Sequence, residues 1–213
     1  MVVISKKTIQ ERIKNGEISF DPPLDIFQLH NHAVDLRLGF QFAIPKVWQL
    51  TEKGREELNT DYHQDKDVEA FEKIDLKPGQ FFDLLPHEYI LATTLEKVSI
   101  PNDLMGILYP RSSTNRRGLS VDLTGIIDSG YEGYLTIPIR NNTQSQKVRL
   151  YPGERICQIV FEELSEAVPD GRQSRYHDKG PLQLWKKDKN DETELILSGD
   201  IEKLKKDFPL QEE

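Results

Sequence analysis

A short polar segment near the middle of the chain carries the residue types that bind phosphate groups. Residues 110–118 read Pro-Arg-Ser-Ser-Thr-Asn-Arg-Arg-Gly after an apolar run, which predicts one or two helical turns with a serine N-cap and Gly118 at the C-cap. A helix N-terminus offers free N–H groups and a positive dipole, which suit a phosphate. Arg111 adds a bidentate donor, and Ser112 and Ser113 add hydroxyl groups. The alternative is an ordinary capped turn.

The charge around this segment differs from that of the rest of the chain. The whole chain has a net charge of -8, which argues against a general nucleic-acid binder, because phosphate backbones require a basic surface. No acid lies between Asp103 and Asp122, whereas Arg111, Arg116 and Arg117 do. This local positive charge suits a small, strongly anionic ligand, although three arginines can also form a solvated face.

A second segment combines an acid with an aromatic residue. Residues 125–133 read Gly-Ile-Ile-Asp-Ser-Gly-Tyr-Glu-Gly, the pattern of two strands joined by a tight turn. Asp128 could hydrogen-bond its own backbone in such a turn. If it points at a substrate instead, its carboxylate can take a proton from a water molecule. Tyr131 would then offer a flat face to a sugar or a base.

Two further polar residues lie in predicted strands. Asp35 is an acid in an otherwise apolar run, and it either faces solvent or has a function. Gln158 follows the turn at residues 152–153 and could face a ligand or the edge of the core.

Zinc-dependent deamination of a base is excluded by the ligand pattern. That chemistry requires H-x-E and P-C-x-x-C motifs, and Cys157 is the only cysteine. A single cysteine also excludes an internal disulfide and suits the reducing cytosol. The chain has no secretory signal and no run of ~18 apolar residues, so we expect a cytoplasmic protein without a membrane segment.

The elements that must position these residues are mostly short strands. Ser5 to Gly16 reads as an amphipathic helix, and eight apolar runs separated by Pro, Gly, Asn and Asp turns read as strands. The runs are residues 34–44, 81–85, 89–98, 104–109, 119–127, 134–139, 148–150 and 156–161. This spacing favours an all-β sandwich or barrel over alternating βαβ units.

Two charged segments carry no recognisable chemistry. Residues 46–73 read as an insertion with a weak helix around 53–58, and the tail from residue 186 has a possible helix at 200–206. We therefore expect one domain over residues 1–185, with a charged insertion at 46–73, and a charged C-terminal extension over 186–213.

The order of the four polar segments resembles the dUTPase and dCTP deaminase superfamily. Ala33-x-Asp35-Leu36, Pro110-Arg-Ser112, Gly125–Gly133 and Pro152–Gln158 are similar to four of the five motifs of trimeric dUTPases. The fifth motif, a glycine- and serine-rich flap, is absent. The N-terminal region and residues 175–181 resemble the dCTP deaminase branch instead, so the likeness covers residues 4–185.

The resemblance implies a distorted, jelly-roll-type β-barrel with a short N-terminal helix, acting as a homotrimer on a deoxynucleoside triphosphate. It implies that Asp128 activates the attacking water and that Asp35 holds the water shell of a magnesium ion bound with the triphosphate. It implies substrate contacts for a further set of residues: Arg111, Ser112, Ser113, Arg116, Tyr131, Gln158, Tyr176 and Lys179.

One position departs from the deaminase pattern. In that branch, a glutamate ten residues after the turn aspartate performs the deamination, and Pro138 occupies that place here. Proline cannot exchange a proton. We therefore predict hydrolysis of dUTP to dUMP and pyrophosphate. The alternatives are a mono- or bifunctional dCTP deaminase whose acid comes from elsewhere, and a non-catalytic deoxynucleotide-binding protein.

Overall fold

The computed structural model describes residues 2–58, 70–122, 125–169 and 192–209. The chain divides into two compact units, each described by itself. The first comprises residues 1–45 and 71–183, and the second comprises residues 46–70 and 184–213. No helix in the described ranges is long and apolar enough to cross a membrane.

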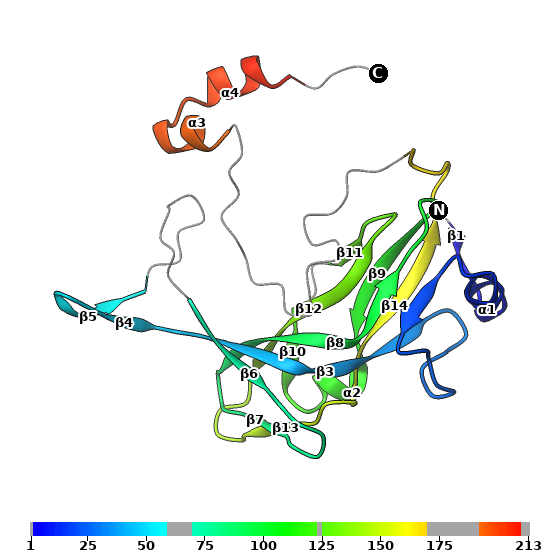
Figure 1. Cartoon of the computed structure of the whole chain (residues 1–213), viewed down its shortest axis with the longest axis horizontal. Helices are drawn as coiled ribbons and strands as arrows, with labels where there is room; N and C mark the ends of the chain where they lie inside the picture. The colour runs from blue at the N-terminus through cyan, green and yellow to red at the C-terminus, as the bar shows by residue number, and fades with distance from the viewer. Residues whose placement is uncertain (1, 59–69, 123–124, 170–191, 210–213) are drawn as a thin grey trace. The chain divides into compact units, whose positions relative to one another are not determined.

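The first unit is built almost entirely of strands (Figure 1). The helices in the described part of this unit are α1 (Lys6–Lys14) and α2 (Ser112–Asn115). Its strands are β1 (Val2–Val3), β2 (Ser19–Asp21), β3 (Val34–Pro45), β6 (Phe71–Asp75), β7 (Phe82–Leu84), β8 (Tyr89–Ser99), β9 (Leu104–Pro110), β10 (Leu119–Val121), β11 (Ile126–Ile127), β12 (Glu132–Asn141), β13 (Val148–Leu150) and β14 (Arg155–Glu163).

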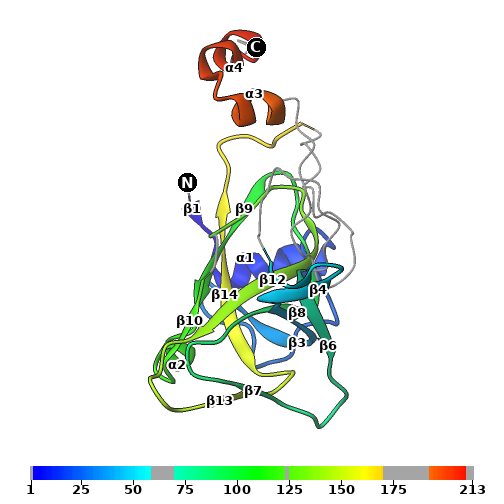
Figure 2. The ribbon, with the colours of Figure 1, turned by 90° about the vertical axis from the view of Figure 1, so that its left-hand side faces the viewer.

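Antiparallel pairing joins most of these strands into one curled sheet, whose main path runs β10-β12-β8-β3-β14-β9-β11. Strands β1, β2 and β6 pair beside this path, and β7 pairs with β13 in a separate ribbon. Figure 2 shows the strands of the first unit curving around a common interior. The prediction of an all-β fold with a distorted barrel is therefore confirmed, as a curled antiparallel half-barrel.

The core follows from the alternation of apolar and polar residues along the strands. On β12, every second residue from Gly133 to Asn141 is buried, and the intervening ones lie on the outer face. The aromatic rings of Phe42 on β3 and Phe82 on β7 stack with centroids 4.9 Å apart. The predicted N-terminal helix is confirmed as α1, and its Ile9 is fully buried in the core.

The segment predicted as one strand over residues 119–127 is interrupted. Its first part, β10, pairs with β12, and its second part, β11, pairs with β9 at the other end of the sheet path. The two strands predicted at Gly125–Gly133, joined by a tight turn, are present as β11 and β12, but they do not pair with each other as the strands of a hairpin would. Strand β12 pairs with β8 and β10, so the turn links two distant strands of the sheet.

The second unit contains β4 (Trp48–Thr51), β5 (Gly54–Glu57), α3 (Thr193–Ser198) and α4 (Ile201–Asp207). The helix predicted around residues 53–58 is wrong, because β4 and β5 form an antiparallel hairpin there. Gly54 has a φ of 111°, a conformation that L side chains rarely adopt, and this allows the tight turn. The helix predicted at 200–206 is confirmed as α4.

Candidate active site

The predicted phosphate-binding turn lies directly after β9. Arg111 is the N-cap of α2 with an extended backbone, so the N-cap is not a serine as predicted. Ser112 and Ser113 follow it as exposed residues in the first turn. Thr114 is buried, and its hydroxyl donates to the Ile156 carbonyl of β14 at 3.2 Å. The turn is thereby tied to the middle of the sheet while its serines face outward.

Asp35 holds the arginine of this turn in place. Its carboxylate is 1% exposed, and one oxygen lies 2.9 Å from Nε of Arg111 and 3.2 Å from a terminal nitrogen of Arg155. His30 lies 3.0 Å from the same oxygen. Arg111 also donates to the Arg155 carbonyl at 3.2 Å. A charged pair out of water requires such multiple partners, and here they fix the direction of the guanidinium.

The fit of magnesium to this site depends on Asp35. Among the described residues, no cluster of three or more His, Cys, Asp or Glu side chains could hold a metal ion. The Asp35 carboxylate contacts two arginines, so the predicted contact with the water shell of magnesium would compete with these pairs. That contact stays a prediction.

Asp128 lies in the turn between β11 and β12, and it is exposed. Its carbonyl accepts a hydrogen bond from the Tyr131 N–H at 3.1 Å, and the Gly130 N–H donates to the Pro101 carbonyl at 3.3 Å. Gly130 has a φ of 73°. These backbone bonds define the turn and leave the Asp128 side chain on the surface, where a water molecule can reach it.

Tyr131 is almost fully buried, whereas a residue that stacks on a ligand needs an accessible ring face. It is 6% exposed, and its hydroxyl donates to the Tyr134 carbonyl at 2.7 Å. Burial raises the pKa of Tyr131 to about 12, so the hydroxyl stays protonated and fixed. Within one chain, little of the Tyr131 ring is therefore accessible to a ligand.

The remaining predicted site residues differ in their distance from Asp35. Gln158 is half-buried on β14, where its partners in the sheet register are Asp35 of β3 and Tyr109 of β9. Arg116 is exposed at the C-cap of α2. Tyr176 and Lys179 lie outside the described residues. Within one chain, the structure brings Asp35 and Arg111 together with Arg155 and His30, and it pairs Asp35 with Gln158.

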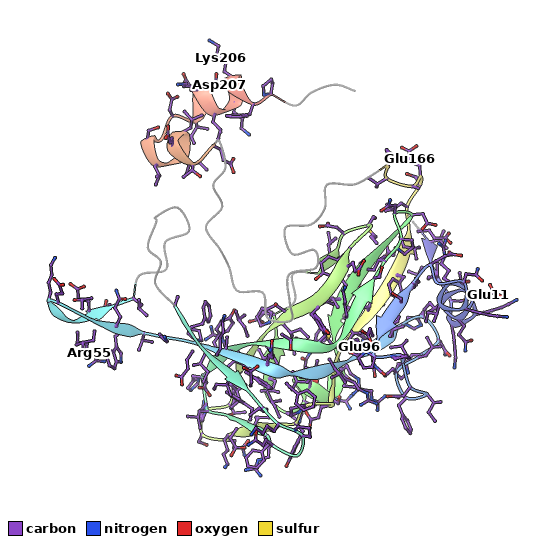
Figure 3. All side chains as sticks on the ribbon, viewed as in Figure 1. Glu11, Arg55, Glu96, Glu166, Lys206 and Asp207 are labelled. Carbon is purple, nitrogen blue, oxygen red and sulfur yellow. The ribbon has the colours of Figure 1, made fainter. Side chains whose placement is uncertain are left out.

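A buried acid that the sequence reasoning missed is Glu96 on β8, labelled in Figure 3. It is 1% exposed, and it accepts from the Gln28 amide at 2.7 Å and from the Arg37 N–H at 2.9 Å. Burial raises its pKa, an effect that the two donors partly offset. A glutamate inside the apolar run of residues 90–98 was the available signal.

Pro138 lies on the outer face of β12, opposite the end of β10. The register of these strands pairs Ser120 with Arg140 and Val121 with Ile139. The Asp122 N–H then donates to the Pro138 carbonyl at 3.0 Å, which extends the pairing by one residue. An exposed acid therefore lies directly across from the proline.

Comparison with known proteins gives a consistent result. A family model described as dCTP deaminase-like matches residues 3–164. A Methanobrevibacter smithii protein named "dCTP deaminase, dUMP-forming" is 37% identical over 169 residues, covering 78% of this chain and 82% of that protein. A protein of the same name from Dictyoglomus thermophilum is 37% identical over 187 residues, covering 84% of this chain and 92% of that protein.

A solved structure supports the fold. The crystal structure of 2'-deoxycytidine 5'-triphosphate deaminase from Agrobacterium tumefaciens superposes with a TM-score of 0.55 at 20% identity. The match covers 75% of this chain and 48% of that chain.

The predicted reaction is corrected by these relatives. Hydrolysis of dUTP as the main activity is contradicted, because the relatives are named as dCTP deaminases that form dUMP. The alternative of a bifunctional deaminase is the better supported one. The prediction rested largely on the absence of an acid side chain at position 138.

Proposed function

Because the chain belongs to the dCTP deaminase-like family, we propose that it converts dCTP to dUMP with release of ammonia and pyrophosphate. The observation that carries the proposal is its 37% identity to a protein named "dCTP deaminase, dUMP-forming". The conversion consumes two water molecules. One replaces the amino group at C4 of the base, and the other attacks the α-phosphorus and releases pyrophosphate.

Arg111, Ser112 and Ser113 would bind the phosphates. The Arg111 guanidinium is already fixed by Asp35 at 2.9 Å, so little reorganisation accompanies binding. Preorganised donors of this kind stabilise charge that develops on phosphate oxygens in the transition state. The exposed serine hydroxyls at the start of α2 complete this end of the site.

Asp128 would take a proton from the water that attacks the α-phosphorus. Its exposed position on a turn with a well-defined backbone supports this role. General-base assistance contributes about 10²–10⁴-fold to a rate, so positioning and electrostatics must supply the rest.

The other predicted contacts belong to the same proposal. Tyr131 would form the wall under the deoxyribose through its packed ring, a role that does not require its hydroxyl. Arg116 and Gln158 would contact the phosphates from α2 and β14, and Tyr176 and Lys179 would close over the triphosphate.

Magnesium would arrive with the triphosphate, where it neutralises part of the phosphate charge. The active unit would be a homotrimer in which neighbouring subunits complete each site. The exposed apolar side chains of Tyr109 (46%) on β9 and Ile126 (62%) on β11 support a subunit contact. Sedimentation of the full chain tests the assembly, and a monomer at assay concentration contradicts it.

The reaction is tested by supplying dCTP or dUTP with Mg²⁺ to the full-length protein and measuring ammonia and pyrophosphate separately. We expect both products from dCTP, and pyrophosphate alone from dUTP. Pyrophosphate without ammonia from dCTP would overturn the proposal. Binding of dCTP without any product would indicate a non-catalytic nucleotide-binding protein.

A further inference from the structure

Deamination requires a group that moves protons between the attacking water and the base. The outer face of β12 carries Glu132, Tyr134, Thr136, Pro138 and Arg140. Glu132, the acid in this set, forms an ion pair with Lys97 at 2.6 Å. The Glu132 carboxylate is therefore already paired with a cation. A second acid that points to the same face follows β10.

Asp122 meets this requirement through the register of β10 and β12. Residues paired across antiparallel strands point to the same face of the sheet. Val121 and Ile139 pair and are both buried, so Asp122 and Pro138, one residue further along each strand, both point outward. The hydrogen bond from the Asp122 N–H to the Pro138 carbonyl makes this a hydrogen-bonded pair, whose Cα atoms typically lie ~5.5 Å apart.

The proline explains why pairing stops at this point. In a hydrogen-bonded antiparallel pair, each residue donates to and accepts from the other. Pro138 has no N–H, so it accepts from Asp122 and cannot donate in return. Strand β10 accordingly ends at Val121. The acid therefore lies beside position 138, just beyond the end of a strand.

The Asp122 carboxylate lies near a side chain of β8. Tyr89 of β8 pairs with Arg140, whose guanidinium lies 5.4 Å from the centre of the Tyr89 ring. Burial raises the pKa of Tyr89, and the Asp122 carboxylate raises it further. The carboxylate is thus close enough to Tyr89 on β8 for its charge to act on the phenol.

We propose that Asp122 supplies the carboxyl group for deamination, in place of an acid at position 138. This proposal rests on the proposed dCTP deaminase function. The Asp122 carboxylate takes a proton from water as the water oxygen bonds to C4, and delivers it to N3. It then takes the proton of the new C4 hydroxyl and delivers it to the amino group. The C4–N bond breaks, ammonia leaves, and the C4 carbonyl forms with the carboxylate regenerated.

The test compares ammonia release from dCTP with pyrophosphate release from dUTP in full-length Asp122→Asn. We expect the ratio of the two rates to fall about 100-fold or more, the range of general acid–base assistance. The matched control is Asp75→Asn, an exposed aspartate at the end of β6, which should change the ratio less than about twofold. An unchanged ratio in Asp122→Asn overturns the proposal.

A second variant decides the case in which Asp122→Asn loses both activities. Adding Pro138→Glu moves the carboxyl across the strand pair on the same face. Recovery of ammonia release by about tenfold or more over Asp122→Asn supports the proposal, and no recovery overturns it. The proposed function fails separately, and distinguishably, if the unmodified protein releases no ammonia from dCTP.

Discussion

Two pairs of acids in the first unit differ in their exposure to solvent. Asp35 and Glu96 are each 1% exposed and accept hydrogen bonds or ion pairs from several partners. Asp122 and Asp128 have exposed side chains, and their backbones are held by hydrogen bonds of 3.0 and 3.1 Å. The buried acids have their oxygens committed to the protein, whereas the exposed acids can meet water and substrate. This difference separates acids that shape the site from acids that could perform the chemistry.

The largest expected effect concerns the exposed Asp128. Asp128→Asn removes the proposed base at the α-phosphorus, so we expect pyrophosphate release to fall about 10²–10⁴-fold. Nucleotide binding should stay within a few-fold of the unmodified protein, as measured by titration calorimetry. The control is Asp103→Asn, an aspartate that pairs with Arg12 at 2.8 Å. A variant that loses binding and turnover together would show that Asp128 shapes the site instead.

The next effect concerns the buried Asp35. Asp35→Asn leaves Arg111 and Arg155 without their countercharge, and breaking a buried pair in this way costs about 3–5 kcal/mol of unfolding free energy. Urea unfolding measures the loss. The control is Asp25→Asn, whose partly exposed pair with Arg37 should cost less than about 1 kcal/mol. Equal losses in the two variants would mean that burial does not strengthen the ion pairs of Asp35 relative to that of Asp25.

A smaller effect is the pH dependence caused by Glu96. Burial raises its pKa in the folded state, so the folded protein binds a proton more tightly than the unfolded chain. This contribution favours folding at acid pH, and it is lost as the pH rises from about 4.3, the ordinary glutamate value, through the folded pKa. Glu96→Gln should remove this fall in stability.

Thermal unfolding between about pH 4 and pH 7 measures the Glu96 contribution. We expect the Tm of Glu96→Gln, relative to the unmodified protein, to increase across this range. A difference in Tm that does not change with pH reflects the lost hydrogen-bond acceptor for Arg37 or Gln28, and it is subtracted. The control Glu72→Gln, an exposed glutamate on β6, should give parallel curves. Parallel curves for Glu96→Gln as well would contradict the raised pKa.

The smallest effect concerns the tie between α2 and the sheet. Thr114→Val removes the hydroxyl that donates to the Ile156 carbonyl while keeping a side chain of similar shape. We expect a loss of about 1 kcal/mol in unfolding free energy, with a modest rise in KM for dCTP. An unchanged KM would show that the phosphate turn does not depend on this anchor.

The sequence predicted much of the fold because the strands alternate regularly. The β3, β8, β9 and β14 strands and the α1 helix lie within a few residues of their predicted bounds. The pairing partners were not predictable, because register and sheet position depend on contacts distant in sequence. The expected hairpin at residues 125–133 failed for this reason, since local turn residues do not reveal that β11 pairs with β9.

The sequence predicted which residues belong to the candidate site better than it predicted which of their side chains contact one another. Arg111, Ser112 and Ser113 were recognised from their positions after a strand. That Asp35 binds Arg111 could not be read from the sequence, because 76 residues separate the two (111 minus 35). Likewise, the loss of an acid at position 138 was visible, but Asp122 across the strand pair was not.

The order of strands in the sheet has a consequence for the turn that carries Asp128. Strands β12 and β11 are separated by β8, β3, β14 and β9, so in a flat sheet they would stand about 24 Å apart at ~4.8 Å per neighbour. The turn between Ile127 and Glu132 spans at most roughly 18 Å when fully extended. The turn is therefore too short to connect β11 and β12 in a flat sheet. The connection between these two strands requires the sheet to curve, and the same turn carries Asp128, the proposed catalytic aspartate.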